Sequence, residues 1–295
     1  MKVLVSLINY NSLDFILSCL EDIFAQETNH SFKVVVFDND SPDKSADEIK
    51  SRFPKIHLIK NDKNLGFGKA HNLVAKEFIQ DFDAMLSVNP DVSFEKDTFE
   101  KMFNSFNEEK KTGVLSGKIY KPNHSLDSNG GDYPFGLALF NWLFNLEFLG
   151  FKTNFHRSES EYFEKKHEVD WVGGTFLLVS KELIEENGLF NEDYFMYFED
   201  VELSYRAKQK GYAVILDPQF AVTHHSGGSS DNPRYFQWSN EYKNLLLFYR
   251  NNFGFLSSLF VKILVYISIV LRIVAFGLLG KTKTAQTYLK VLRNI

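Results

Sequence analysis

The fold of this chain is decided by residues 2–42, which read KVLVSLINYNSLDFILSCLEDIFAQETNHSFKVVVFDNDSP. Residues 2–8 are apolar and rich in β-forming side chains, as in a strand that is buried on both faces of a sheet. Residues 16–24 carry apolar side chains at helical spacing, and residues 32–37 form a second apolar run. This strand–helix–strand order predicts parallel strands with a helix packed on the sheet.

The same alternation continues along the chain. It predicts helices between further strands at residues 56–60, 84–88, 113–120, 170–179, 212–216 and 221–225. Residues 132–168, aromatic early and charged late, are expected to be a loop-rich insertion. The predicted fold class is therefore α/β, with a parallel sheet flanked by helices and ligands at the carboxyl ends of the strands.

The composition argues against a nucleic-acid binder and against a disulfide-bonded protein. A net charge of −5 over 295 residues argues against a general nucleic-acid binder, which would carry a basic patch. Cys19 is the only cysteine, so no disulfide forms within the chain, as is usual in a reducing cytosol. We expect Cys19 to lie in the core, because its helical pattern is apolar.

Acidic residues follow two of the predicted strands. Asp38, directly after the second strand, is placed to accept the imide N–H of a uracil or thymine ring, although Asp-Asn-Asp-Ser-Pro also suits an Asx turn. Asn89-Pro90-Asp91 closes the fourth strand. One carboxylate there can hold a divalent ion bound to a diphosphate, or Asp91 can simply cap the chain that follows a proline turn.

An acid pair and a histidine pair stand in the second half of the chain. Glu199-Asp200 begins a predicted helix, where acids also serve as caps. Adjacent helical side chains diverge, so we expect one of them, Asp200, to face the site as a base, with Glu199 as a supporting acceptor. His224 and His225 close a strand, where alternation turns one imidazole toward the site as a metal ligand or leaves both in structural roles.

A glycine-containing stretch precedes the helix that ends near Phe78. It reads NLGFGKAHN over residues 64–72. Glycines at the start of a helix let backbone amides approach a phosphate. The stretch fits neither a Walker loop nor a dinucleotide fingerprint, because it lacks the third glycine and does not follow the first strand.

Together these motifs resemble inverting glycosyltransferases of family 2, and within them the bacterial rhamnosyltransferase-type branch. The resemblance implies the GT-A fold, in which helices flank a Rossmann-like nucleotide-binding mixed sheet. The resemblance covers about residues 1–250. It is carried by Asn9-Tyr10-Asn11, Asp38-Asn39-Asp40-Ser41, residues 64–72, Asn89-Pro90-Asp91, Trp171-Val172-Gly173-Gly174, Phe195-Met196-Tyr197-Phe198-Glu199-Asp200 and His224.

The resemblance implies a role for each matching position. The nucleotide-sugar would be bound by Asn9, Tyr10, Asn11, Asp38, Asp40, Asn64, Gly66, Lys69 and Asn89. Asp91 and His224 would hold Mg²⁺ or Mn²⁺. Trp171, Gly173 and Gly174 would shape the sugar and acceptor pocket, and Asp200 with Glu199 would be catalytic.

The chain departs from the family pattern at three places. Asn89-Pro90-Asp91 replaces the commoner Asp-x-Asp, which removes one carboxylate and makes metal binding more dependent on the diphosphate and His224. Glu202 stands where this branch often has aspartate. His225 beside His224 leaves the identity of the metal ligand open.

The implied activity is transfer of a sugar with inversion onto a saccharide hydroxyl. The donor would be dTDP-rhamnose or a UDP-hexose. The acceptor would be a saccharide or a lipid-linked oligosaccharide, in bacterial surface polysaccharide biosynthesis. Two alternatives remain open from the residues alone: a sugar nucleotidyltransferase, which usually has a basic glycine-rich loop after the first strand, and a non-catalytic nucleotide-sugar or glycan-binding scaffold at the membrane.

The C-terminal segment differs in composition. Residues 253–280 are strongly apolar but contain Lys262 and Arg272, whose insertion costs about 2.5–3.5 kcal/mol each at the centre of a membrane span. We therefore favour a helix on the inner leaflet over a spanning helix or packing within the protein. The predicted organisation is a catalytic domain at 1–250, divided near residue 115 into nucleotide-sugar and acceptor halves, and a membrane-associated tail at 251–295 of a cytoplasmic protein.

Overall fold

The computed structural model describes residues 1–108, 111–150, 154–225 and 234–295. The chain forms two compact units. The first, which we call the sheet unit, comprises Met1–Tyr133, Phe155–Phe195 and Glu199–Ser229. The second, the helical unit, comprises Pro134–Asn154, Met196–Phe198 and Ser230–Ile295, so its last segment begins before the predicted boundary at residue 250.

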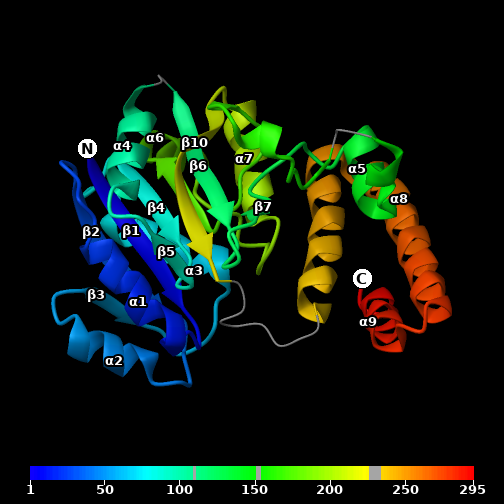
Figure 1. Ribbon diagram of the computed structural model, residues 1–295, viewed down its shortest axis with the longest axis horizontal. Helices are drawn as coiled ribbons and strands as arrows, with labels where there is room; N and C mark the ends of the chain where they lie inside the picture. Colours follow the sequence, from blue (N-terminus) through cyan, green and yellow to red (C-terminus); the bar gives the residue numbers. More distant parts are fainter. Residues whose placement is uncertain (109–110, 151–153, 226–233) are drawn as a thin grey trace. The chain divides into compact units, whose positions relative to one another are not determined.

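The sheet unit is built on one mixed sheet with the strand order β3-β2-β1-β4-β9-β6-β10-β5 (Figure 1). The first four of these are parallel, as the alternation in the sequence predicts, whereas β9 runs antiparallel to both β4 and β6. The strands are β1 (Lys2–Asn9), β2 (Ser31–Asp38), β3 (His57–Lys60), β4 (Ala84–Val88), β5 (Val92–Phe94), β6 (Thr112–Tyr120), β7 (Leu126–Asp127), β8 (His167–Glu168), β9 (Phe176–Ser180) and β10 (Ala213–His224).

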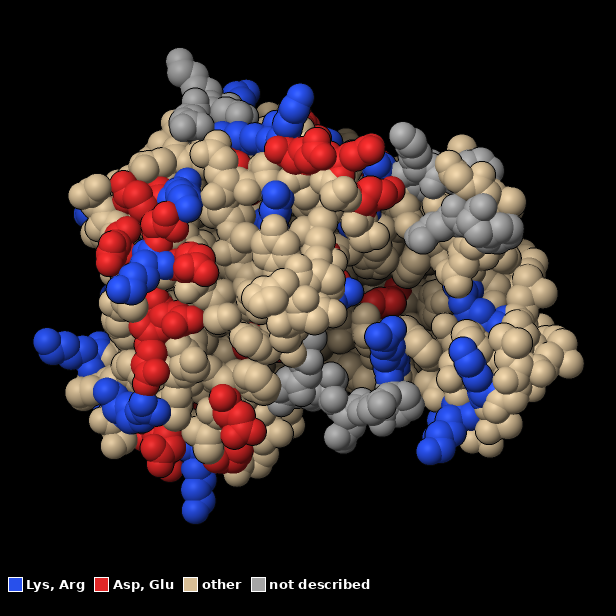
Figure 2. Space-filling view, viewed as in Figure 1, with Lys and Arg blue, Asp and Glu red and all other residues tan. Residues whose placement is uncertain are grey.

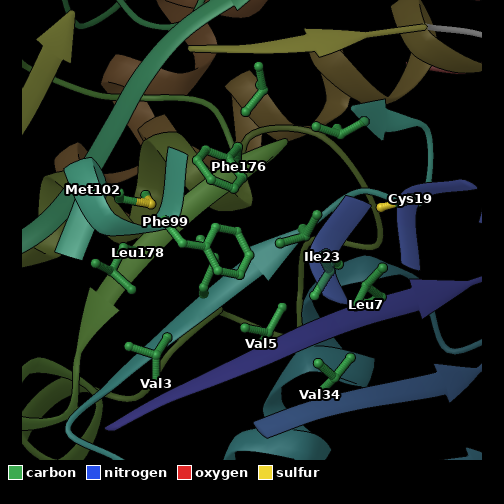
Figure 3. Close-up of a cluster of buried hydrophobic side chains, with 14 of the residues drawn as sticks. Val3, Val5, Leu7, Cys19, Ile23, Val34, Phe99, Met102, Phe176 and Leu178 are labelled. Atoms are coloured by element: carbon green, nitrogen blue, oxygen red, sulfur yellow. The ribbon is translucent and has the colours of Figure 1, made fainter. Parts of the chain in front are cut away.

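Helices cover both faces of this sheet, because side chains alternate along each buried strand. In β1, Val3, Val5 and Leu7 face one core (Figure 3), whereas Leu4 faces the other. Cys19 belongs to the first core, as expected. The helices of this unit are α1 (Leu13–Phe24), α2 (Ser45–Arg52), α3 (Phe67–Phe78), α4 (Thr98–Glu108), α6 (Lys181–Asn187), α7 (Glu199–Gln209) and η2 (Ser160–Phe163).

Three expectations about secondary structure are wrong. The strand predicted at 170–179 begins only at Phe176, and Trp171 makes an isolated bridge to Gly131. The two strands predicted at 212–216 and 221–225 are one irregular strand, β10, whose register shifts between Leu216 and Ala221. The region 132–168, expected to be loop-rich, contains helix α5 (Gly136–Phe144) as well as η1 (Leu146–Leu149), η2 and β8.

The helical unit contains α5, η1, α8 (Tyr235–Leu278) and α9 (Thr282–Leu292). Gly254 interrupts α8 with φ 80° and ψ −180°, a conformation that glycine adopts readily. Beyond this kink, Val261, Val265 and Ile269 are buried on one side of α8. One face of this helix therefore packs within the protein, which is one of the three arrangements considered for the tail.

The opposite face of α8 is exposed. We call it the apolar stripe: Phe255, Leu256, Leu259, Phe260, Ile263, Ile267, Val270, Leu271, Val274 and Leu278. Its members recur every three or four residues, and Leu256 is 79% exposed. Arg272, expected on a cationic edge, instead donates to the carbonyl oxygens of Leu143 and Trp142 in α5. Among the described residues, α8 is the one helix that is long and apolar enough to cross a membrane.

Candidate active site

Sheet topology brings the predicted site residues to one edge of the sheet unit. Asn9 ends β1, Asp38 ends β2, and Asn89 and Asp91 follow β4, and these three strands are parallel. Because β9 is antiparallel to both β4 and β6, and β10 is parallel to β6, β10 also ends at this edge, at His224. Strand topology alone therefore gathers residues that are more than 200 positions apart in sequence.

Asn9 holds Asp38 in place. The side-chain amide of Asn9 donates to Asp38 Oδ1 over 2.6 Å and to Ser45 Oγ over 2.7 Å, and its Oδ1 accepts from Ser12 at 2.6 Å. Asp38 Oδ2 accepts from the backbone N–H of Ser41. Asn9 is fully buried and contacts Asp38, whereas the neighbouring Tyr10 is exposed.

Asn39, to which the sequence pattern assigns no separate role, organises the loop at residues 64–66. Its Nδ2 donates to Asn64 Oδ1 and to the carbonyl oxygen of Gly66, and its Oδ1 accepts from the N–H of Leu65 at 2.9 Å. The N–H groups of Gly66 and Phe67 also have acceptors, in Asn64 Oδ1 and the carbonyl of Phe195. The amides expected to approach a phosphate are thus already hydrogen-bonded within the chain.

The glycines of this stretch have steric explanations. Gly66 has φ +82°, and a Cβ there would lie 2.4 Å from the carbonyl oxygen of Phe195. A Cβ on Gly68 would lie 2.9 Å from Cβ of Phe190. Lys69 forms an ion pair with Glu192 at 3.1 Å.

Asn11 and Asp40 flank the Asp38 network on exposed loop positions. Both have positive φ, 52° and 66° respectively, a region that asparagine and aspartate tolerate better than most side chains. Their side chains therefore belong to the surface beside Asp38 and Tyr10.

Asp91 and His224 lie together, as expected. Asp91 Oδ1 is 3.2 Å from His224 Nε2, and both side chains are mostly buried. The antiparallel pairing of His224 with Val92 brings them into contact. His225 instead has its Nε2 3.0 Å from Ser93 Oγ, with its ring near Phe15, so the structure distinguishes the two histidines.

This pair fits two positions on a divalent ion. Ligands about 2.1 Å from an octahedral ion and at right angles are separated by about 3.0 Å, close to the observed distance. Within the described ranges, no group of three or more His, Cys, Asp or Glu side chains is arranged to hold a metal. With the second carboxylate missing from Asn89-Pro90-Asp91, water or a diphosphate are candidates for the other ligand positions.

Asp200 lies at the start of α7 and accepts hydrogen bonds from two backbone N–H groups, one of them outside this helix. Gly174 donates to Oδ2 over 2.9 Å and Val201 donates to Oδ1 over 2.8 Å. Burial raises the pKa of Asp200 above its ordinary value of 3.8, and these two hydrogen bonds act in the opposite direction. Asn89 N–H donates to the carbonyl of Thr175, which connects the Asp91 loop to the segment that holds Asp200.

Glu199 differs from its neighbour. It is only 6% exposed, and its Oε2 has no hydrogen-bond partner among the described residues. Burial and then the charge of Asp200 raise the pKa of Glu199 well above its ordinary value of 4.5, so both act in favour of its uncharged form. The two adjacent acids therefore have different surroundings.

The segment at residues 171–174 is hydrogen-bonded to Asn129 and to the backbone of Phe155. Asn129, which also carries no signal in the sequence, accepts from the N–H of Gly173 at 3.0 Å and donates to Ser116 and to the carbonyl of Gly117. A Cβ on Gly173 would lie 2.7 Å from Asn129 Oδ1. Trp171 is buried, and its indole N–H donates to the carbonyl of Phe155, so it shapes the site by packing.

Glu202 has a structural partner. It forms an ion pair with Arg206, whose Nε lies 2.7 and 2.8 Å from the two carboxylate oxygens, and Arg206 Nη2 donates to the carbonyl of Leu189. This pairing accounts for an acid whose role the sequence leaves open.

The sequence matches the family model "Glycosyl transferase family 2" over residues 5–187. Among curated relatives, the chain is 26% identical to an N-acetylglucosaminyl-diphospho-decaprenol L-rhamnosyltransferase of Mycobacterium tuberculosis, over 69% of each chain. It is 27% identical to the rhamnosyltransferase WbbL of Escherichia coli K12, over 80% of this chain and 89% of that one.

Solved structures of low sequence identity share the fold. The mannosyltransferase PcManGT from Pyrobaculum calidifontis, in complex with GDP-Man and Mn²⁺, matches with a TM-score of 0.59 and 14% identity, over 98% of this chain and 85% of that one. TarS of S. aureus, residues 1–349 in complex with UDP-GlcNAc, matches with a TM-score of 0.57 and 18% identity, over 99% and 80%. These similarities confirm the expected GT-A fold.

Proposed function

The chain belongs to glycosyl transferase family 2, and we propose that it moves a sugar from a nucleoside diphosphate onto a saccharide hydroxyl with inversion, using Asp200 as the base. The observation that carries the proposal is the double anchoring of Asp200 by Gly174 and Val201. A carboxylate held in this way keeps one orientation, and burial makes it a stronger base than a solvated aspartate.

In the proposed reaction, Asp200 removes the proton of an acceptor hydroxyl while that oxygen attacks the anomeric carbon of the donor. The new bond joins the acceptor oxygen to the anomeric carbon. The bond from that carbon to the diphosphate oxygen breaks, and its electron pair leaves with the nucleoside diphosphate. One displacement inverts the anomeric centre, so the mechanism needs no covalent sugar–enzyme intermediate.

Asp91 and His224 are the residues that would hold Mg²⁺ or Mn²⁺, because their donor atoms fit two adjacent positions on such an ion. The ion would neutralise negative charge on the departing diphosphate. His224 must be unprotonated to act as a ligand, and Asp91 must be ionised.

The nucleoside would lie beside Asp38, Asp40 and Tyr10, at the carboxyl ends of β1 and β2. Asp38 is held rigidly by Asn9, which suits recognition of an imide N–H. The relatives named as rhamnosyltransferases support dTDP-rhamnose as the donor, with a UDP-hexose as the other candidate.

The acceptor would be a lipid-linked saccharide, and α8 and α9 would bring the enzyme to the inner face of the cell membrane. The relative named for a diphospho-decaprenol substrate supports such an acceptor. No acidic residue follows Glu241, whereas eight lysines and arginines do. Figure 2 shows blue and tan atoms, without red, over α9 and the C-terminal part of α8.

The apolar stripe is the surface that would enter the lipid. It has no charged member, and lysines at 281, 283 and 290 follow it along the chain. Exposed apolar side chains beside cations are typical of helices that lie in the interface of an anionic bilayer. Such placement would keep the enzyme at the surface where a lipid-linked acceptor resides.

A donor screen tests the proposed function. Thermal unfolding would be measured with UDP- and dTDP-sugars, each with and without Mn²⁺, because a ligand that binds the folded state raises its stability. The stabilising donor would then be tested for transfer to a synthetic lipid-diphosphate saccharide, with Asp200→Asn as the control. Transfer by that variant at the rate of the unchanged enzyme would exclude Asp200 as the base.

A further inference from the structure

The two residues before the acid pair have a strained backbone. Tyr197 has φ 70° and Phe198 has φ 73°, in the left-handed region that side chains other than glycine rarely adopt. Two consecutive residues of this kind persist only where their surroundings impose the conformation. Helix α7 begins at the next residue, Glu199, so this turn determines the direction in which α7 starts.

The side chain of Asn244 in α8 holds this turn. Its Nδ2 donates to the carbonyl oxygen of Met196 over 3.0 Å and to that of Tyr197 over 2.7 Å. Asn244 is 7% exposed, so both hydrogen bonds are shielded from water. One amide group thus bridges consecutive carbonyls that the left-handed turn leaves outside any helix or strand.

Aromatic packing supports the same turn. The ring of Phe198 lies 6.1 Å from the rings of Trp142 and Phe248. Phe248 is one helical turn from Asn244 in α8, so the same side of this helix contacts both the backbone and the side chain of the turn.

We infer that Asn244 is a positioning residue for the base. The inference rests on the proposed function of Asp200, which lies two residues after the turn. If the carbonyls of Met196 and Tyr197 lose their donor, the left-handed turn relaxes and the start of α7 shifts. Asp200 would then lose its alignment with Gly174 N–H, whereas Asp38 and Asp91 follow other elements, β2 and β4.

The test uses Asn244→Leu, which keeps the volume of the side chain but has no donor, and Asn244→Ala. We expect kcat to fall about 10- to 100-fold, because small displacements of a reacting group have effects of that size. The KM for the donor and the thermal shift with the donor nucleotide should stay within about twofold to threefold. Asn240→Ala is the matched control, since that side chain donates to the carbonyl of Phe236 in its own helix.

Rescue distinguishes positioning from a general effect on folding. Glycine adopts positive φ without strain, so Tyr197→Gly combined with Asn244→Leu should restore part of the lost kcat. Unchanged kcat in both Asn244 variants, equal losses of kcat and donor affinity, or failure of both variants to fold would overturn the inference. Failure of the proposed function has a different signature, namely full activity of Asp200→Asn in the same assay.

Discussion

Gly174 and Asp200 are 26 residues apart, and the backbone N–H of Gly174 donates to Asp200 Oδ2 over 2.9 Å. A Cβ on Gly174 would lie 3.3 Å from the ring of Phe67, so a larger residue there would disturb this contact. Asp200, the proposed base, is therefore held by the backbone that leads into β9 as well as by its own helix.

The acid pair predicts different outcomes for two isosteric changes. Asp200→Asn should lower transfer about 10²- to 10⁴-fold while donor affinity is retained, because the base is removed. Glu199→Gln should stay within about tenfold of the unchanged enzyme, because glutamine keeps the shape of the side chain and Glu199 Oε2 has no hydrogen-bond partner to lose among the described residues. Initial rates and calorimetric titration with the donor nucleotide measure both effects, and equal losses in the two variants would contradict the assignment.

The raised pKa of Asp200 predicts the acidic side of the pH–rate profile. A general base works only when it is deprotonated, so kcat/KM should rise with pH through a pKa above the ordinary aspartate value of 3.8. The measurement is kcat/KM between pH 4 and pH 8 at saturating Mn²⁺. If the apparent pKa of the acidic limb lies at or below that ordinary value, burial does not raise the pKa of the base.

The Asp91–His224 pair predicts a specific metal dependence. Asp91→Ala and His224→Ala should each raise the Mn²⁺ concentration that gives half-maximal transfer by at least about tenfold, because one of two protein ligands is lost. His225→Ala is the matched control, since its imidazole contacts Ser93 rather than Asp91. Transfer by the unchanged enzyme that resists EDTA would refute a divalent ion at this pair.

His71 predicts how stability depends on pH. It is fully buried between Ser6 Oγ and Ser87 Oγ, and burial lowers its pKa from 6.5 to about 3. Above pH 6.5 the side chain is neutral in both states and adds no pH dependence. Below pH 6.5 the unfolded chain binds a proton that the folded chain does not, so the free energy of unfolding falls by about 1.4 kcal/mol per pH unit until pH approaches 3.

Urea unfolding of the unchanged protein and of His71→Gln at pH 7 and pH 5 checks this effect. Glutamine does not titrate, so its disadvantage relative to histidine should shrink by about 2 kcal/mol between the two pH values. A constant difference would mean that His71 is protonated in the folded protein.

The cations that follow the apolar stripe predict binding to anionic vesicles. Lys281→Gln with Lys283→Gln should weaken binding to phosphatidylglycerol-containing vesicles about 30-fold, since each lysine near such a surface contributes about 1 kcal/mol. Lys55→Gln with Lys63→Gln, on exposed positions of the sheet unit, is the matched control. Co-sedimentation measures both pairs, and equal effects would indicate attraction by net charge rather than docking of the tail.

Local patterns in the sequence are sufficient to predict the parallel half of the sheet and the edge at which several candidate site residues gather. Runs such as residues 3–5 and 34–37 are clear signals because strands buried on both faces are continuously apolar. The polar residue after each strand then lies at a known edge of the sheet, which is why the sequence alone assigns Asp38 and Asp91 to one region.

Long-range hydrogen bonds cannot be predicted in this way. Asn39 and Asn129 hold the segments at 64–66 and 173 through side-chain contacts that leave no periodic signal. Helix α5 escapes prediction because its apolar residues pack on α8, more than 90 positions later. The glycines at 66 and 68 suggest phosphate binding in the sequence, although close contacts with Phe195 and Phe190 account for them.

The gathering of the site at one end of the strands leaves their starting ends available for other uses. Lys2, Ser31 and Asp83 lie there: Lys2 and Asp83 are joined by backbone and carboxylate hydrogen bonds, and the N–H of Ser31 donates to the carbonyl of Met1. A fluorophore or immobilisation tag attached at that end would be separated from the chemistry by the full length of β1. Single-molecule and surface-capture experiments on this enzyme can therefore use attachment points at the starting ends of these strands.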